Sequence, residues 1–275
     1  MDLHEYARNL SKIVKEGKDP REKKPFIVFN CEDFRKYISL SSSWVLTLDN
    51  FQIHLVQPND IALYANITEK ALHDARHFYD NNPAWYMKRQ SGGMIPVTQN
   101  TELLYFDYFE SIMKAVIFAF TSLETFANIC LPENYVYIDI KGKHINKEAI
   151  ERKRSLDFKL EFVLSDILRT PDPKKEIWWP IYTKLKNIRD RIIHSKASTA
   201  EERFSILLSP NIFEIIGCFR QILTYYGGFI AYNYVSLLDE FPYGFGFDEF
   251  EAKTISNAEY ERLYNNMHNP WRPGN

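Results

Sequence analysis

The side chains best suited to chemistry lie close together, between residues 186 and 196. This stretch contains Arg189, Asp190 and His194. On a helix, Asp190 and His194 are four positions apart and share a face. Arg189 and His194 are five positions apart, which separates them by roughly 140° around the helix axis. The spacing therefore predicts a carboxylate, an imidazole and a permanent cation at one end of a helix.

These residue types suit phosphodiester chemistry without a metal ion. A carboxylate such as Asp190 can orient a neighbouring imidazole or raise its pKa. Arg189 carries a charge that binds phosphate, and His194 can transfer protons. The alternative is a solvated helix end, where the helix dipole favours Arg and His. From the chemistry alone, this simpler alternative is favoured.

A second cluster contains His73 and His77, again four positions apart. Two imidazoles at this spacing can bind one metal ion. No further His or Cys lies near them in the sequence, so we interpret the cluster as an exposed helix face. Gly-rich phosphate loops, zinc-protease motifs and nucleophile elbows are absent from the sequence. We therefore expect no metal and no cofactor.

Four helices are expected to position the candidate site. Apolar residues recur every three to four positions in each of them, and Pro or capping residues mark their ends. Thr101 and Ser155 are the expected N-caps of the first two, and Gly227 is expected to interrupt the last. The short connections predict a helical bundle. The expected helices are 101–130, 156–168, 176–195 and 209–238.

The first hundred residues mix short strands with helices. Apolar runs predict a strand and a hairpin whose turn is Asp49-Asn50. Thr68 is the expected N-cap of a further helix. The expected strands are 26–29, 44–48, 51–56 and, between two bundle helices, 135–140. The expected helices and helical turns outside the bundle are 1–16, 32–40, 69–79 and a stretch from 146.

These elements predict a mainly α fold in three parts. Residues 1–98 form a small α+β extension of unknown role. Residues 99–240 form the helical bundle. Residues 241–275 form an irregular, aromatic C-terminal tail that packs on the body of the protein.

Composition restricts partners and compartment. The 275 residues carry a net charge of −2, so nucleic acid has no global positive field to bind and would need a local cleft. Aromatic residues make up 15%, which predicts large rings in a core or an interface. The three cysteines show no zinc or disulfide spacing and are expected to be reduced. Without a signal peptide or a long apolar run, the protein is expected to be cytoplasmic, with no membrane partner.

The Arg189-Asp190-x-x-x-His194 string resembles the signature of the HEPN superfamily, in which His follows Arg after four to six residues. Residues 120–128 (Phe-Thr-Ser-Leu-Glu-Thr-Phe-Ala-Asn) are similar to a string on the first helix of many HEPN proteins. Residues 155–160 (Ser-Leu-Asp-Phe-Lys-Leu) resemble a common helix start in that family. The resemblance covers about residues 100–238, and Asp190 stands where the family often has Asn.

The resemblance implies a metal-independent endoribonuclease. His194 would be the general acid–base and Arg189 would stabilise the phosphate, with Asp190 beside them. Two chains would form one composite cleft as a homodimer. Such proteins often act as toxins or phage-defence effectors, so an antitoxin or regulatory partner is a further expectation.

Supporting residues can be assigned on the same basis. Glu124 and Asn128, four apart, would face the motif helix and fix Arg189 or His194, or else form a polar pair at the edge of the bundle. The local candidates for RNA-backbone contacts are Arg191, Lys186 and Lys196.

A non-catalytic HEPN-like module is the alternative function. It would serve dimerisation, nucleotide binding or binding of a protein partner. Trp178 and Trp179 are expected mostly in the core or a dimer interface, with base stacking as a lesser alternative.

Overall fold

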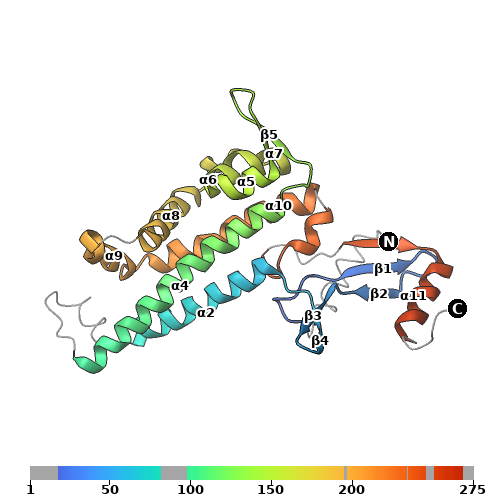
Figure 1. Cartoon of the computed structure of the whole chain (residues 1–275), viewed down its shortest axis with the longest axis horizontal. Coiled ribbons are helices and arrows are strands. Elements are labelled where there is room, and N and C mark those ends of the chain that lie inside the picture. Colours follow the sequence, from blue (N-terminus) through green and yellow to red (C-terminus); the bar gives the residue numbers. More distant parts are fainter. Residues whose placement is uncertain (1–17, 82–97, 195–196, 234, 246–250, 269–275) are drawn as a thin grey trace. The chain divides into compact units, whose positions relative to one another are not determined.

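The computed structural model describes residues 18–81, 98–194, 197–233, 235–245 and 251–268 (Figure 1). The expected helix over 1–16 lies outside these residues. The chain divides into two compact units. One is helical and contains Asp60–Tyr226, and the other combines Met1–Asn59 with Gly227–Asn275. This division differs from the expected one, because the boundary falls at residue 59 instead of 98 and the C-terminal residues join the N-terminal strands.

Two long helices lie side by side in the helical unit, α2 (Asp60–Asn81) and α4 (Gln99–Ile129) (Figure 1). Helix α2 is longer than expected. Thr68 is not its N-cap but lies in its interior, where its hydroxyl donates to the Tyr64 carbonyl at 3.0 Å. The early residues Ile61 and Ala65 are buried, so packing extends the helix beyond the local capping signal.

Helix α4 provides much of the core of this unit. Its buried residues recur at helical spacing, as the sequence pattern predicts. They include Ile112, Val116, Ala119, Leu123 and Ala127. By length and composition, residues Glu102–Ile129 would suffice to cross a membrane, but half of the most apolar stretch is buried within the protein. Core helices pass the same test, so this is weak evidence for a membrane span.

A small hairpin follows α4, formed by β5 (Val136–Ile138) and β6 (His144–Asn146). Helix α5 (Lys147–Lys153) begins directly after it. The Asn146 side chain caps this helix by accepting a hydrogen bond from the Ala149 amide at 3.1 Å. The expected strand over 135–140 is therefore only one arm of a hairpin.

The expected helix 156–168 is present but irregular. Ser155 caps α6 (Leu156–Phe158) as predicted, accepting from the Phe158 amide at 3.3 Å. The next residues form a π-helical turn, η1 (Lys159–Val163), before α7 (Leu164–Leu168) resumes α geometry. The run ends at Arg169, which is left-handed with φ 54°.

Three more helices complete the unit. Helix α8 (Trp179–Ile193) has Pro180 in its first turn, where Pro is tolerated. Helix α9 (Ala200–Leu207) was not expected from the sequence. Helix α10 (Ile212–Asn233) passes through Gly227 without interruption, contrary to the expected break. A Cβ at Gly227 would lie 2.5 Å from the Phe241 ring, so glycine makes room for that ring.

The other unit contains a three-stranded sheet in the order β2-β1-β7. Strand β1 (Phe26–Asn30) is the expected strand. It pairs antiparallel with β2 (Tyr37–Leu40) and parallel with β7 (Ala252–Ile255). The expected helical turns within 32–40 are therefore wrong, because β2 gains the backbone hydrogen bonds of a neighbouring strand. The side chains of β2 pack in two small apolar clusters, one around Phe29 and one around Val28.

The C-terminal part is more ordered than the expected irregular tail. Besides β7 it forms the turn η4 (Val235–Glu240) and helix α11 (Asn257–His268). Phe241 and Tyr243 are buried as expected, and the ammonium of buried Lys24 lies 5.9 Å and 5.7 Å from their ring centroids. Residues 246–250 of the aromatic segment lie outside the described residues.

The expected hairpin of the N-terminal part is present. Strand β3 (Ser43–Leu48) pairs antiparallel with β4 (Phe51–Val56), and Asp49 in the turn is left-handed with φ 51°. The described residues are thus mainly helical, with two small sheets formed by residues near the N-terminus and one C-terminal strand, and the β5–β6 hairpin in the helical unit.

Candidate functional site

The candidate residues lie at the C-terminal end of α8. His194 is the residue that closes this helix, and its backbone N–H donates to the Asp190 carbonyl at 2.8 Å. Arg189 and Asp190 belong to the last regular turn. The expected placement of all three residues at one helix end is confirmed.

Arg189 is held by two neighbours. Its guanidinium donates to the Asp190 carboxylate at 2.9 Å, and its Cζ lies 4.8 Å from the centroid of the Phe120 ring. Phe120 comes from α4, so two helices fix the guanidinium. The Arg189 side chain remains 30% exposed, which leaves it accessible to a ligand.

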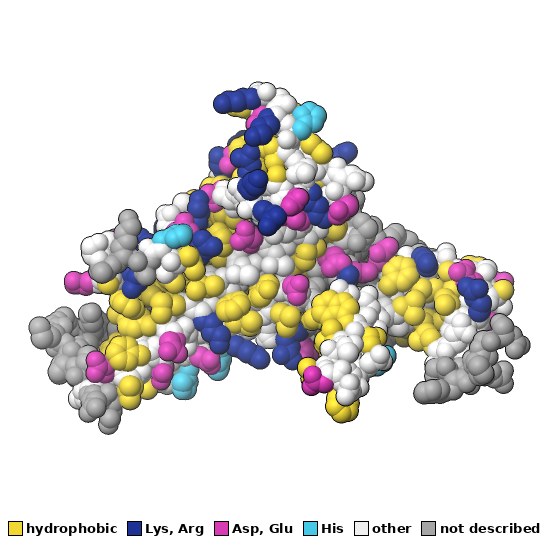
Figure 2. Space-filling model, viewed as in Figure 1, with side chains coloured by type: hydrophobic (Ala, Val, Ile, Leu, Met, Phe, Trp, Pro, Cys, Tyr) yellow, Lys and Arg dark blue, Asp and Glu magenta, His cyan; other side chains and the backbone are white. Residues whose placement is uncertain are grey.

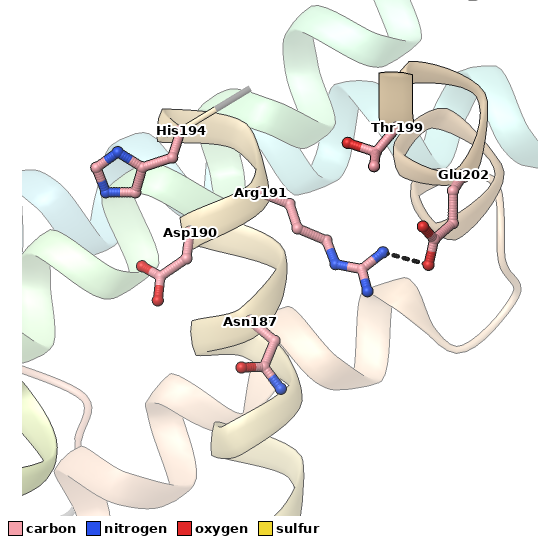
Figure 3. Close-up of a pocket in the computed structure, with 6 residues that line it drawn as sticks. All are labelled: Asn187, Asp190, Arg191, His194, Thr199 and Glu202. Atoms are coloured by element: carbon pink, nitrogen blue, oxygen red, sulfur yellow. Dashed lines mark hydrogen bonds and ion pairs between the residues drawn. The ribbon is translucent and has the colours of Figure 1, made fainter. Parts of the chain in front are cut away.

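Asp190 therefore contacts the cation and not the imidazole. In the described part of the chain, no side-chain hydrogen bond joins the Asp190 carboxylate to the His194 imidazole, although Figure 3 shows both side chains at the same helix end. The expected orientation of His194 by Asp190 is not seen. A neighbouring guanidinium is the stronger competitor for the carboxylate, because it is always charged and presents its donors in a fixed geometry.

A shallow open pocket of about 550 Å³ lies beside this helix end (Figure 3). It is formed by the end of α8 and the segment that begins α9. Its lining residues are Asn187, Asp190, Arg191, His194, Thr199 and Glu202. All six carry polar or charged side chains, which can bind a charged or hydrogen-bonding ligand.

Two of the three expected RNA-backbone cations are already paired. Arg191 donates to Glu202 at 2.6 Å, and Lys186 donates to Asp157. Lys196 lies outside the described residues. Partly exposed ion pairs contribute only about 0–1 kcal/mol, so a phosphate could replace the carboxylate partner of either cation.

A buried aromatic arrangement supports Arg189. The Phe120 ring stacks on Tyr182 with centroids 6.4 Å apart and an interplanar angle of 12°. The Tyr182 hydroxyl donates to Asp157 at 2.5 Å. Burial first, and then this hydrogen bond, raises the pKa of Tyr182 far above its usual range. Tyr182 therefore remains a hydrogen-bond donor at neutral pH.

Sequence reasoning missed Tyr182, Asp157 and the role of Phe120. One signal was available, because Tyr182 and Lys186 precede Arg189 on the same helix at spacings of seven and three. The contact with Phe120 had no comparable signal, since it joins residues 69 positions apart.

Glu124 and Asn128 bind a different residue from the one expected. Both accept hydrogen bonds from the ammonium of Lys159, Glu124 at 3.4 Å and Asn128 at 2.8 Å. The Glu151 carbonyl accepts the third at 3.0 Å. Among the described residues, neither side chain bonds to Arg189 or His194. The expectation that they fix the motif is therefore corrected: Glu124 supplies the counter-charge, and Asn128 a neutral acceptor, for a lysine whose side chain is fully buried.

The second histidine cluster is an exposed helix face, as interpreted. The His73 side chain is 82% exposed and lies 3.5 Å from Asp74, and His77 contacts Asn81 at 3.1 Å. In the ranges that the structure describes, no three His, Cys, Asp or Glu side chains are grouped so as to hold a metal ion.

The tryptophan pair is part of the core. Trp178 is only 3% exposed and packs edge-on against Tyr225, so it does not present a face to a base. Trp179 is half-buried and packs on Tyr182 with centroids 5.4 Å apart. Cys130 and Cys218 are buried, and burial raises the pKa of the Cys218 thiol to about 12. These residues therefore fill the helical unit.

Comparison with protein-family models, with curated proteins and with solved structures finds no match to this chain. The activity of this protein is therefore inferred from its local geometry and from the resemblance of the motif strings.

Proposed function

We propose that this protein is a metal-independent endoribonuclease of the HEPN type, with a HEPN-like bundle formed by the helical unit. The observation that carries the proposal is the end of α8. There a partly exposed guanidinium, Arg189, is held by Phe120 and Asp190, and His194 lines an open pocket. One helix end thus carries both a cation that can bind phosphate and a group that can transfer protons.

The reaction divides between these two residues. His194 removes the proton from a ribose 2′-hydroxyl, whose oxygen attacks the adjacent phosphorus. The bond from phosphorus to the 5′-oxygen breaks, and that oxygen takes up a proton. Arg189 stabilises the charge on the non-bridging oxygens. The products carry a 2′,3′-cyclic phosphate and a 5′-hydroxyl.

Arg189 must exchange partners in this scheme. The side chains of Arg189 and Asp190 are 30% and 42% exposed, so their ion pair stabilises the protein only weakly. A phosphate that displaces Asp190 leaves the Phe120 contact intact. Phe120 then acts as a positioning residue, because it keeps the guanidinium at this end of α8 while its anion changes.

The proposed assembly is a homodimer with a composite cleft. A single chain offers one His194, whereas the reaction requires proton removal and proton donation on opposite sides of the phosphate. A second copy would supply the other proton-transfer group. A toxin or phage-defence role, with an antitoxin or regulator as partner, belongs to the same proposal.

A non-catalytic binding module is the second candidate. It is favoured by the ionic partners of the cations near the pocket, since Arg189, Arg191 and Lys186 each contact a carboxylate. Such a module would keep its fold and assembly when Arg189 or His194 is replaced, and would leave RNA intact.

The deciding experiment is RNA cleavage in the presence of EDTA. We expect Arg189→Ala and His194→Ala each to reduce cleavage at least a hundredfold, because each removes one element of the reaction. Mapping of the ends should find 2′,3′-cyclic phosphates. The matched controls are Arg152→Ala and His73→Ala, whose side chains are 73% and 82% exposed on other helices. Cleavage that survives both site substitutions would contradict the assignment, and an inactive wild type would favour the binding module.

A further inference from the structure

The β3–β4 hairpin has one apolar face and one more polar face. Its register sets Trp44 opposite Leu55, Leu46 opposite Ile53, and Leu48 opposite Phe51. Because opposed residues in a sheet point to the same side, these side chains form a single surface, which we call the apolar hairpin face. The alternate positions form the other, more polar side, which carries Ser43, Thr47, Gln52 and His54 together with Val45 and Val56.

The apolar hairpin face is open to solvent along its whole length. Figure 2 shows hydrophobic side chains at the place of β3 and β4 in Figure 1. The exposed fractions are 40% for Trp44, 43% for Leu46, 61% for Leu48, 73% for Phe51, 44% for Ile53 and 44% for Leu55. Six large apolar residues on one side of a two-stranded sheet make a contiguous patch of the kind that marks an interaction surface.

This arrangement needs a covering surface to be stable. A two-stranded hairpin is at best marginally stable in water, and packing against a further layer is what normally stabilises it. Soluble proteins protect exposed strands with Lys, Pro or bulges, and residues 43–56 contain neither Lys nor Pro. The sequence alternation also matches burial of one face.

The chemistry of the face argues against a charged surface as its partner. Asp49 and His54 are the ionisable residues of the hairpin, and neither belongs to the apolar face. Without Lys or Arg, the hairpin has no attraction to anionic lipid headgroups. An apolar, uncharged surface is complementary to another of the same kind.

We propose that the apolar hairpin face is an interface between two copies of this chain, in which the same face of each covers the other. A two-fold contact buries identical patches, and no charge on this face opposes it. At roughly 200 Å² for each large side chain, half of it exposed, each copy contributes on the order of 600 Å², close to the roughly 800 Å² per partner of a stable interface.

The proposal is independent of the ribonuclease assignment and of its composite cleft, because the hairpin belongs to the other unit. The two hairpins stack about 10 Å apart, as packed sheets do. The polar side with Thr47 and Gln52 remains in water.

The test compares substitutions on the two faces of one strand. Leu46→Glu places a charge at the centre of the apolar face, and Thr47→Glu places the same charge on the polar face next to it. Light scattering on size-exclusion chromatography at 1–50 µM measures the mass. We expect Leu46→Glu to halve the mass of the wild-type particle and Thr47→Glu to leave it unchanged. Circular dichroism confirms that both variants fold, which is expected since Leu46 is already 43% exposed.

Cross-linking gives a second readout that does not require the interface to be broken. In a Cys31→Ser background, oxidised Ile53→Cys should form a disulfide-linked dimer at least tenfold faster than Thr47→Cys. Equal rates, or an unchanged mass for Leu46→Glu, would overturn the proposal. So would a monomeric wild type that floats with neutral phosphatidylcholine vesicles, since a lipid surface would then be the occupant.

Discussion

At the residue scale, Arg189 shows how a partly exposed cation can be both held and available. An exposed cation–π contact is worth about 0.5–1 kcal/mol, and an exposed ion pair about as much. Neither Phe120 nor Asp190 therefore binds the guanidinium tightly. A phosphodiester, whose negative charge is shared by two non-bridging oxygens, can compete with Asp190, whereas the apolar Phe120 ring has no such competitor.

Asp239 provides a pH-dependent contribution to stability at the same scale. Burial, opposed by a hydrogen bond from the Glu251 amide at 3.2 Å, raises the pKa of Asp239 to about 6. A raised carboxyl pKa means that the folded state favours the protonated form. The free energy of unfolding therefore falls as the pH rises from about 4, the pKa of the carboxyl in the unfolded chain, to about 6. Above pH 6 the whole loss is present.

We accordingly expect Asp239→Asn to stabilise the protein at neutral pH. The gain should be roughly 1 kcal/mol at pH 7.5, after allowance for partial exposure, and close to zero at pH 4. Urea unfolding followed by circular dichroism at the two pH values measures it. An equal gain at both would mean that ionisation of Asp239 is not the cause.

At the scale of elements, the π-helical turn η1 places one charge inside the protein. Lys159 is its first residue and is fully buried, and the three protons of its ammonium are matched by Glu124, Asn128 and the Glu151 carbonyl. This links η1 to α4 and α5 at one point. π-Turns often occur at functional positions, but here the described contacts are those of a structural connection.

A double-mutant cycle tests this connection. Glu124→Leu alone leaves a buried ammonium without its counter-charge and should reduce the free energy of unfolding by about 3 kcal/mol. Adding Lys159→Met should recover more than half of that loss, because the charge and its unmet donors disappear together. Chemical denaturation of the four proteins provides the measurement. Simple additivity of the two substitutions would show that the pair is not coupled.

At the scale of the whole molecule, the two ends of the chain belong to one unit. Residues from 227 onward join the first 59, and strand β7 lies parallel to β1. The helical unit with the candidate site is therefore an insertion between the two parts of the other unit. This topology allows the hairpin interface and the composite cleft to be tested separately.

If the ribonuclease requires two copies of α8, its specific activity must depend on protein concentration. We expect activity per mole of chain to fall at least tenfold on dilution below the dissociation constant of the dimer. Cleavage of a fluorescent RNA over a dilution series, compared with mass photometry of the same samples, gives the measurement. Constant specific activity in samples that are monomeric would indicate a site complete within one chain.

The sequence by itself determined the elements whose signal is local. Strand β1, the β3–β4 hairpin, helix α4 and the Ser155 cap all follow from apolar periodicity, turn residues or capping side chains within a short window. Short-range sequence signals of the same kind placed Arg189, Asp190 and His194 together on one helix end.

Only the tertiary structure decided which residues meet. Segment 37–40 forms a strand because it pairs with β1. Residues 252–255, far along the chain, form a strand because they pair with the other edge of β1. The partners of Asp190 and Glu124 were also set in this way. Hydrogen bonds and ion pairs between distant segments depend on packing geometry, which a periodic pattern does not encode. The types of the reactive groups are thus a property of the sequence, and their contacts are a property of the fold.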